Sequence, residues 1–158
     1  TPQVEEDNDT PNGTFPSKEA QVVGLGRVVT LTEPLKLTAV VDRVKKHLGL
    51  PFVRLAAAQS SPQNPIPPES ILIKTIAICA GAGGTVVPKV KADLYLTGEM
   101  RHHEVLAAVQ KGTSVILTDH SNTERGYLKV FKTKLESVFD KSIDIVVSTT
   151  DADPLQVV

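Results

Sequence analysis

The stretch ILIKTIAICAGAGGTVVPKVKADLYLTGEMRHHEVLAAVQKGTSVILTD, residues 71–119, decides the fold, because short apolar runs alternate in it with helical patterns. We expect strands over 71–80, 93–98 and 113–119, with a short helix over 85–92 and a longer one over 99–112. Strands that alternate with helices are joined by right-handed crossovers and pair in parallel. The prediction is an α/β fold with a largely parallel sheet, built from repeated βα units with helices on both faces.

Further elements are predicted on both sides of this stretch. The β-branched run 22–31 indicates a strand, and the apolar residues that follow recur at helical spacing until Gly49, which suits a helix C-terminus. We expect one α/β domain over 21–158, preceded by a flexible polar tail over 1–20 and interrupted by a Pro-rich loop at 59–70. The remaining predicted elements are a strand over 52–58, a helix over 121–139 and a strand over 143–149.

Composition excludes several classes of protein. The formal net charge of −1 gives no indication of a basic surface for nucleic acid or for anionic membranes. The sequence has no apolar run long enough to span a bilayer, and Cys79 is the single cysteine, so no intramolecular disulfide can form. We expect a soluble protein of a reducing compartment, the cytoplasm, with the nucleus or mitochondrion as alternatives. Because the chain starts at Thr1 inside a polar segment, we also expect a piece of a longer polypeptide.

Three groups of polar residues or glycines fall at the carboxyl ends of the predicted strands, where α/β sheets gather ligands. The first is the glycine turn from Gly81 to Thr85, in which Gly83 and Gly84 are candidates for positive φ. Backbone N–H groups of such a turn can hold a phosphate or carboxylate. The alternative is a tight turn that only lets a helix pack closely.

The second group follows Thr97. If a helix begins near Glu99, then Glu99, His102 and His103 share one side of its first turns. Such a cluster could ligate a metal, orient a ligand or shuttle protons. The alternative is structural, because His102 shares an apolar stripe and Glu99 complements the helix dipole.

The third group is His120 with Glu124. Spacing of i and i+4 at a helix start permits both side chains to reach one metal ion, although two ligands are too few for a closed site. The alternative is a capping box, with Ser121 as the N-cap and Glu124 at the third helical position. The residues alone leave both interpretations open.

Four segments together resemble one protein family. They are GLGRVVTLTEPLKLTAVVDRVKKHLGL (24–50), AICAGAGG (77–84), ADLYLTGEMRHHEVLAAVQKG (92–112) and DHSNTERGYL (119–128). The order and spacing are similar to the C-terminal half of Nif-three-like (NGG-one-interacting-factor-three) proteins. The resemblance implies one half of a fold with two related α/β parts around a dinuclear metal centre, assembled as hexameric rings. It implies that His120 and Glu124 are metal ligands, with the other ligands in a half that is missing here.

The resemblance also implies a function. We expect part of a metal-dependent hydrolase that acts on a nucleotide-like or phosphorylated small molecule, inactive as this piece; some family members are described as GTP cyclohydrolases. The intact subunit would hold two divalent ions, of the zinc, iron or manganese type, which this chain alone would bind weakly or not at all. Glu99 and His103 would assist proton transfer. The expected substrate-binding residues are Gly81, Gly83, Gly84, Thr85, Thr97 and His102.

A second function stays open beside hydrolysis. The protein could be a non-enzymatic oligomeric scaffold, or a transcription-linked interaction protein with a structural metal. Its partners would then be copies of itself and a transcription regulator. Neither interpretation requires nucleic acid or a membrane.

Overall fold

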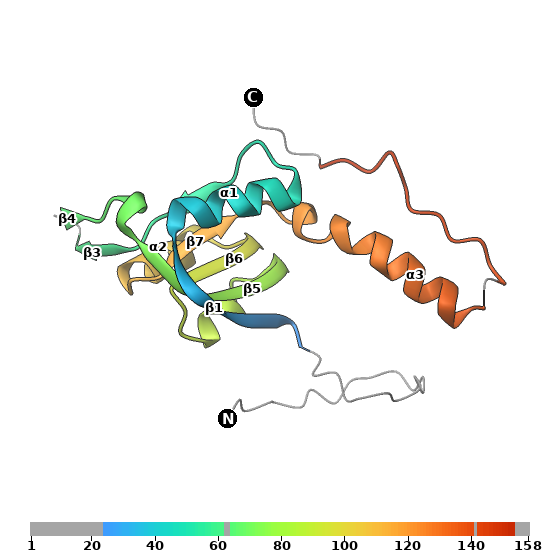
Figure 1. Cartoon of the computed structure of the whole chain (residues 1–158), viewed down its shortest axis with the longest axis horizontal. Coiled ribbons are helices and arrows are strands. Elements are labelled where there is room, and N and C mark those ends of the chain that lie inside the picture. The colour runs from blue at the N-terminus through green and yellow to red at the C-terminus, as the bar shows by residue number, and fades with distance from the viewer. Residues whose placement is uncertain (1–23, 62–63, 141, 154–158) are drawn as a thin grey trace.

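The computed structural model describes residues 24–61, 64–140 and 142–153 (Figure 1). The flexible tail predicted over 1–20 lies outside these residues. Within the described part of the chain, no helix is both long enough and apolar enough to cross a membrane.

One five-stranded sheet forms the centre of the fold. Its strand order is β1-β5-β6-β7-β2, with bounds Gly26–Lys36, Leu72–Ala82, Leu94–Glu99, Ser114–Leu117 and Arg54–Ala56. The three inner strands β5, β6 and β7 pair in parallel, whereas the edge strands β1 and β2 pair antiparallel with β5 and β7. The predicted α/β fold is therefore confirmed, and parallel pairing is confined to the strands that crossovers connect.

Helices cover both faces of this sheet, as predicted. Helix α1 (Leu37–Leu48) lies across one face and α2 (His102–Gln110) packs on the other, together with the 3-10 turn Val87–Lys89 (Figure 1). Successive residues of β5 point to opposite faces of the sheet, so Ile76 joins the apolar cluster under α1 and Ala77 joins the one under α2. Each face thus has its own apolar cluster, and the strand ends between them remain available for polar side chains.

Helix α1 ends where the sequence predicts. Gly49 has φ of 67°, and its N–H donates to the Lys45 carbonyl oxygen. A residue with a Cβ is disfavoured in this left-handed conformation, so the glycine fixes the end of the helix.

The Pro-rich segment contains more regular structure than a loop. Strand β3 (Gln59–Ser61) pairs with β4 (Asn64–Pro65) as a short antiparallel ribbon, and a 3-10 turn follows at Pro68–Ser70.

The C-terminal part differs most from the prediction. The helix expected over 121–139 is broken into two 3-10 turns, Ser121–Thr123 and Arg125–Tyr127, followed by α3 (Leu128–Val138). Helix α3 extends away from the sheet and buries none of its residues (Figure 1). The strand predicted over 143–149 is absent from the described residues 142–153, because the chain after α3 does not return to a sheet edge.

Candidate functional site

The candidate site lies at the carboxyl ends of β5, β6 and β7. Strand β5 runs into Gly81 and Ala82, β6 ends at Glu99, and the segment after β7 leads to His120. The Thr118 N–H donates to the Thr97 carbonyl oxygen (3.2 Å), which keeps the chain after β7 beside β6. Residues of all three predicted groups therefore meet at the carboxyl ends of the inner strands.

The imidazole of His120 lies between two carboxylates. Its Nδ1 is 3.4 Å from Glu99 Oε2, and its Nε2 is 3.3 Å from Glu124 Oε1. The His120 side chain is 45% exposed and each glutamate side chain 51%, so solvent reaches the cluster. The structure thus brings Glu99 to His120 rather than to His102 and His103.

The reason is the start of α2. The sequence predicts a helix from near Glu99, but α2 begins at His102, and Glu99 is the last residue of β6. The Glu104 side chain fixes this start: it accepts hydrogen bonds from the backbone N–H of Arg101 (2.8 Å) and from its Nε (3.0 Å). The same Arg101 contacts lower the pKa of Glu104.

The capping box predicted at Ser121 and Glu124 is absent. No side chain caps either 3-10 turn in this segment, so the Glu124 carboxylate is left to contact His120. Thr123 fixes the segment instead. Its Oγ1 donates to the His120 carbonyl oxygen (2.7 Å) and accepts from the Gly81 N–H (2.7 Å).

Gly81 permits this close packing. Gly81 has φ of 64°, and a Cβ there would lie 2.8 Å from Glu124 Oε1 and 3.0 Å from His120 Nε2. Gly81 therefore leaves open the space between the two side chains. Positive φ occurs at Gly81 and not at Gly83 or Gly84, so that prediction was wrong by two residues.

The buried Thr97 holds the glycine turn. Its hydroxyl donates to the Gly81 carbonyl oxygen and accepts from the Gly83 N–H, both at 3.0 Å. Both partners of the hydroxyl are backbone groups of the turn, so Thr97 supports the turn in this structure. The substrate contact expected of Thr97 stays a prediction.

A cleft of about 560 Å³ opens beside the cluster. Among its lining residues are Gly84, Thr85 and Glu99, which sequence analysis singled out. It is also lined by Ala82, Met100, Arg54, Arg101, Glu104 and Asp119. The expected substrate-binding turn and Glu99 therefore share one concave surface.

Arg54 and Asp119 both line the cleft, and the sequence did not predict the contact between them. Arg54 Nη2 donates to Asp119 Oδ1 at 2.8 Å, across 65 positions of sequence. Asp119 has φ of 66°, an uncommon conformation for a residue with a Cβ, and it directly precedes His120. The ion pair links edge strand β2 to the loop that carries the histidine, and no local sequence signal reveals such a contact.

His102 and His103 lie apart from the cluster. Both are exposed in the first turn of α2, and in the described part of the chain neither forms an ion pair or hydrogen bond with His120 or Glu124. His102 lines a separate hollow of about 290 Å³, together with Arg54, Met100 and apolar residues.

The donor atoms at His120 suit a transition metal. An imidazole nitrogen and a carboxylate oxygen are ordinary ligands of zinc, iron and manganese, and Gly81 leaves room beside them. Across residues 24–61, 64–140 and 142–153, however, no group of three or more His, Cys, Asp or Glu side chains could hold an ion. Glu99 lies on the opposite ring nitrogen. Two donor atoms, His120 Nε2 and Glu124 Oε1, therefore face each other on one side of the ring.

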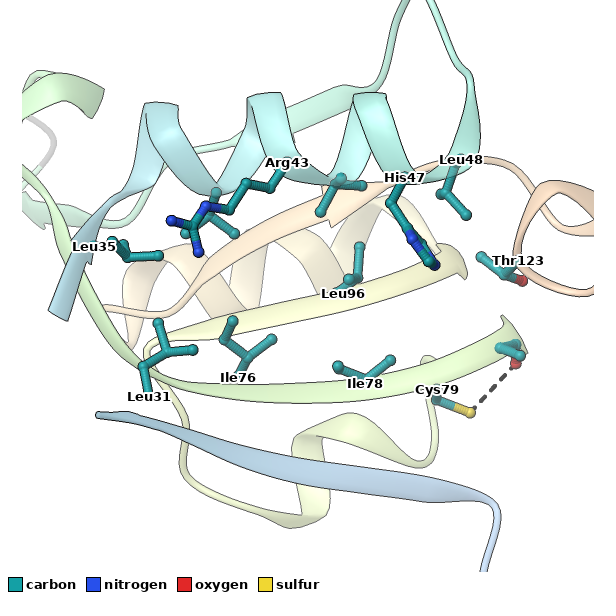
Figure 2. Close-up of a pocket in the computed structure, with 13 residues that line it drawn as sticks. Leu31, Leu35, Arg43, His47, Leu48, Ile76, Ile78, Cys79, Leu96 and Thr123 are labelled. Atoms are coloured by element: carbon teal, nitrogen blue, oxygen red, sulfur yellow. Dashed lines mark hydrogen bonds between the residues drawn. The ribbon is translucent and has the colours of Figure 1, made fainter. Parts of the chain in front are cut away.

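An apolar cavity lies between α1 and the sheet (Figure 2). Its volume is about 400 Å³, and most of its walls are aliphatic side chains such as Leu31, Ile76 and Leu96. Figure 2 shows Arg43 and His47 reaching over it from α1, and Thr123 at the end nearest the candidate site. Nothing in the sequence pattern predicts this cavity, because it depends on how α1 crosses the sheet.

Comparison with known proteins identifies relatives of this chain. Residues 5–154 match the model of the Duf34/NIF3 (NGG1p interacting factor 3) family. "NIF3-like protein 1" of Rattus norvegicus is 47% identical over 136 residues, which are 85% of this chain and 34% of the relative. "NGG1-interacting factor 3" of Saccharomyces cerevisiae is 40% identical over 148 residues, 91% of this chain and 49% of the relative.

Solved structures share the fold. The crystal structure of a Bacillus cereus protein related to NIF3 superposes with a TM-score of 0.69 at 24% identity, covering 85% of this chain and 36% of that chain. The chain thus spans between about a third and a half of the proteins it resembles.

Proposed function

The chain belongs to the Duf34/NIF3 family, and we propose that it supplies His120 and Glu124 to a divalent-metal centre completed by another part of a longer protein. The juxtaposition of His120 Nε2 and Glu124 Oε1, 3.3 Å apart beside a glycine that leaves room for an ion, supports this most directly. Two ligands hold a transition metal weakly, and relatives extend well beyond the matched region. The remaining ligands would come from that additional polypeptide.

The chemistry best suited to this site is hydrolysis. Bound divalent ions lower the pKa of water and polarise the group to be cleaved. This chain would contribute the cleft next to them. Arg54 has five N–H donors and uses one nitrogen for Asp119, so donors remain for an anionic substrate oxygen. The Gly84 and Thr85 turn lines the same cleft, and a nucleotide-like or phosphorylated substrate fits this combination.

The predicted proton-transfer residues differ in position. Glu99 lines the cleft and contacts His120, whereas His103 is exposed on α2. Of the two, only Glu99 is beside the proposed centre in this chain. A contribution of His103 would require a substrate that reaches across the first turn of α2.

Hydrolysis is tested with the full-length protein loaded with zinc, iron or manganese. We expect release of product from at least one member of a panel of nucleotides and phosphorylated small molecules, with activity lost on chelation and regained on adding metal. This chain alone should be inactive, because its metal site is half complete. Absence of turnover across the panel, with metal content verified by elemental analysis, would contradict the enzymatic proposal while leaving metal binding intact.

A second candidate function rests on α3. This helix and its flanks expose a set of large apolar side chains at 40–59% of their surface: Tyr127, Leu128, Val130, Phe131, Val138 and Phe139. An apolar helix face of this kind indicates contact with other polypeptide. The partner would be a second copy of the chain, as in a homo-oligomeric scaffold. A transcription regulator is the other candidate, in keeping with the name of the yeast relative.

Sedimentation of this chain checks that surface. We expect a dimer or larger species at high micromolar concentration, because self-association buries the α3 face. Phe131→Asp should shift the distribution to monomer, whereas Thr133→Asp, an exposed position on the same helix, should leave it unchanged. A compact monomer at all concentrations would contradict self-association through α3.

A further inference from the structure

The two carboxylates at His120 are on opposite sides of its ring. Glu124 Oε1 lies at Nε2 (3.3 Å) and Glu99 Oε2 lies at Nδ1 (3.4 Å). The two nitrogens of one imidazole point in different directions, so a metal at Nε2 shares Glu124 and cannot also share Glu99. Glu99 therefore has a role different from that of a ligand.

The backbone holds Glu99 in this place. Its neighbour Gly98 is buried, and a Cβ there would lie 2.8 Å from His120 Cα and 2.9 Å from the Asp119 carbonyl oxygen. Glu99 itself pairs with Ala82 at the end of the parallel β5 and β6 ladder. The end of β6 is thus pressed against the segment that carries His120, and the carboxylate reaches the ring from a fixed strand.

A carboxylate at one ring nitrogen favours the proton on that nitrogen and so leaves the lone pair of the other nitrogen free to bind a metal. A neutral imidazole carries one proton; if Nδ1–H faces Glu99, the lone pair of Nε2 points toward Glu124 and the open space at Gly81. Histidine ligands in metal sites commonly donate their second N–H to a carboxylate, which fixes tautomer and ring orientation. We infer that Glu99 is a positioning residue that presents Nε2 of His120 to the metal, a role that rests on the proposed centre.

Two readouts test this role. In this chain without metal, the competing carboxylate at Nε2 is first removed by Glu124→Ala. Nitrogen-15 spectra of the neutral His120 ring in that variant, assigned with a His120→Ala variant, should then show Nδ1 protonated and Nε2 free. Adding Glu99→Ala should shift the ring toward a mixture of tautomers. In the full-length protein, Glu99→Ala should weaken zinc binding by about tenfold. Glu99→Gln should weaken it less, because the amide oxygen still accepts from Nδ1–H.

Glu33→Ala is the matched control, because it removes an exposed carboxylate from edge strand β1 without touching His120. It should change neither the tautomer nor the zinc affinity. If wild type binds zinc through His120 and Glu99→Ala changes neither readout, the positioning role is overturned and the metal centre stands. If zinc binding in the full-length protein does not depend on His120 at all, the proposed centre and the role of Glu99 are both overturned.

Discussion

Replacing Gly98 with alanine is expected to lower the free energy of unfolding by about 3 kcal/mol, near the upper end for overpacking a buried position. The added Cβ would lie 2.8 Å from the Gly81 carbonyl oxygen, 2.8 Å from His120 Cα and 2.9 Å from the Asp119 carbonyl oxygen. All three are backbone atoms, so no side chain can rotate away to relieve the contact. The strand ends must separate, and the Glu99–His120 contact would be lost with them.

Urea unfolding of Gly98→Ala and Gly126→Ala measures this effect. Gly126 is the control because a Cβ there meets nothing within 4 Å. Its substitution should change stability by no more than about 0.5 kcal/mol, as for most surface positions. Equal stability of the two variants would show that β6 does not pack closely against the His120 segment.

The elements predicted correctly are those encoded by local pattern. The apolar run of β5 alternates between two cores, and α1 has helical periodicity and a glycine at its end. Because short crossovers connect β5, β6 and β7, their parallel order followed from chain connectivity alone. The sequence also placed His120 and Glu124 together, since four positions separate them.

What local pattern missed depends on tertiary contacts. Glu99 has helical neighbours in sequence, yet the hydrogen bonds from Arg101 to the Glu104 side chain start α2 three residues later, and Glu99 is left on a strand. Its partner His120 is 21 positions away, and only the packing of glycines between strand ends brings them together. Arg54 joins the cleft across a still longer separation.

The C-terminal prediction failed for a related reason. A strand needs a neighbour for its backbone hydrogen bonds. Ile143 and Val146 belong to the β-branched run that predicted a strand, but they are 48% and 79% exposed, and no described strand pairs with them. This segment is exposed like α3, on which the proposed contact surface lies.

Removing the His120 imidazole should have the largest effect on metal binding. In the full-length protein, His120→Ala is expected to lower zinc affinity by about a hundredfold or more, beyond the range for residues that only support a ligand. Glu124→Gln should also weaken binding, because a neutral amide is a poorer ligand than a carboxylate. It should cost the fold little, since the side chain is half exposed and caps no helix.

Circular dichroism and urea unfolding of both variants provide the control for folding. Each should unfold within about 1 kcal/mol of wild type, because both side chains are solvent-accessible and neither joins an apolar cluster. A loss of zinc binding accompanied by unfolding would assign these residues to the fold instead of the metal.

Zinc titration by calorimetry, run in parallel on this chain and on the full-length protein, tests the shared metal centre most directly. We predict tight binding by the full-length protein that depends on His120 and Glu124, and weak binding by this chain alone, with only a slight rise in its melting temperature. One or two ions held tightly by this chain alone would contradict the account.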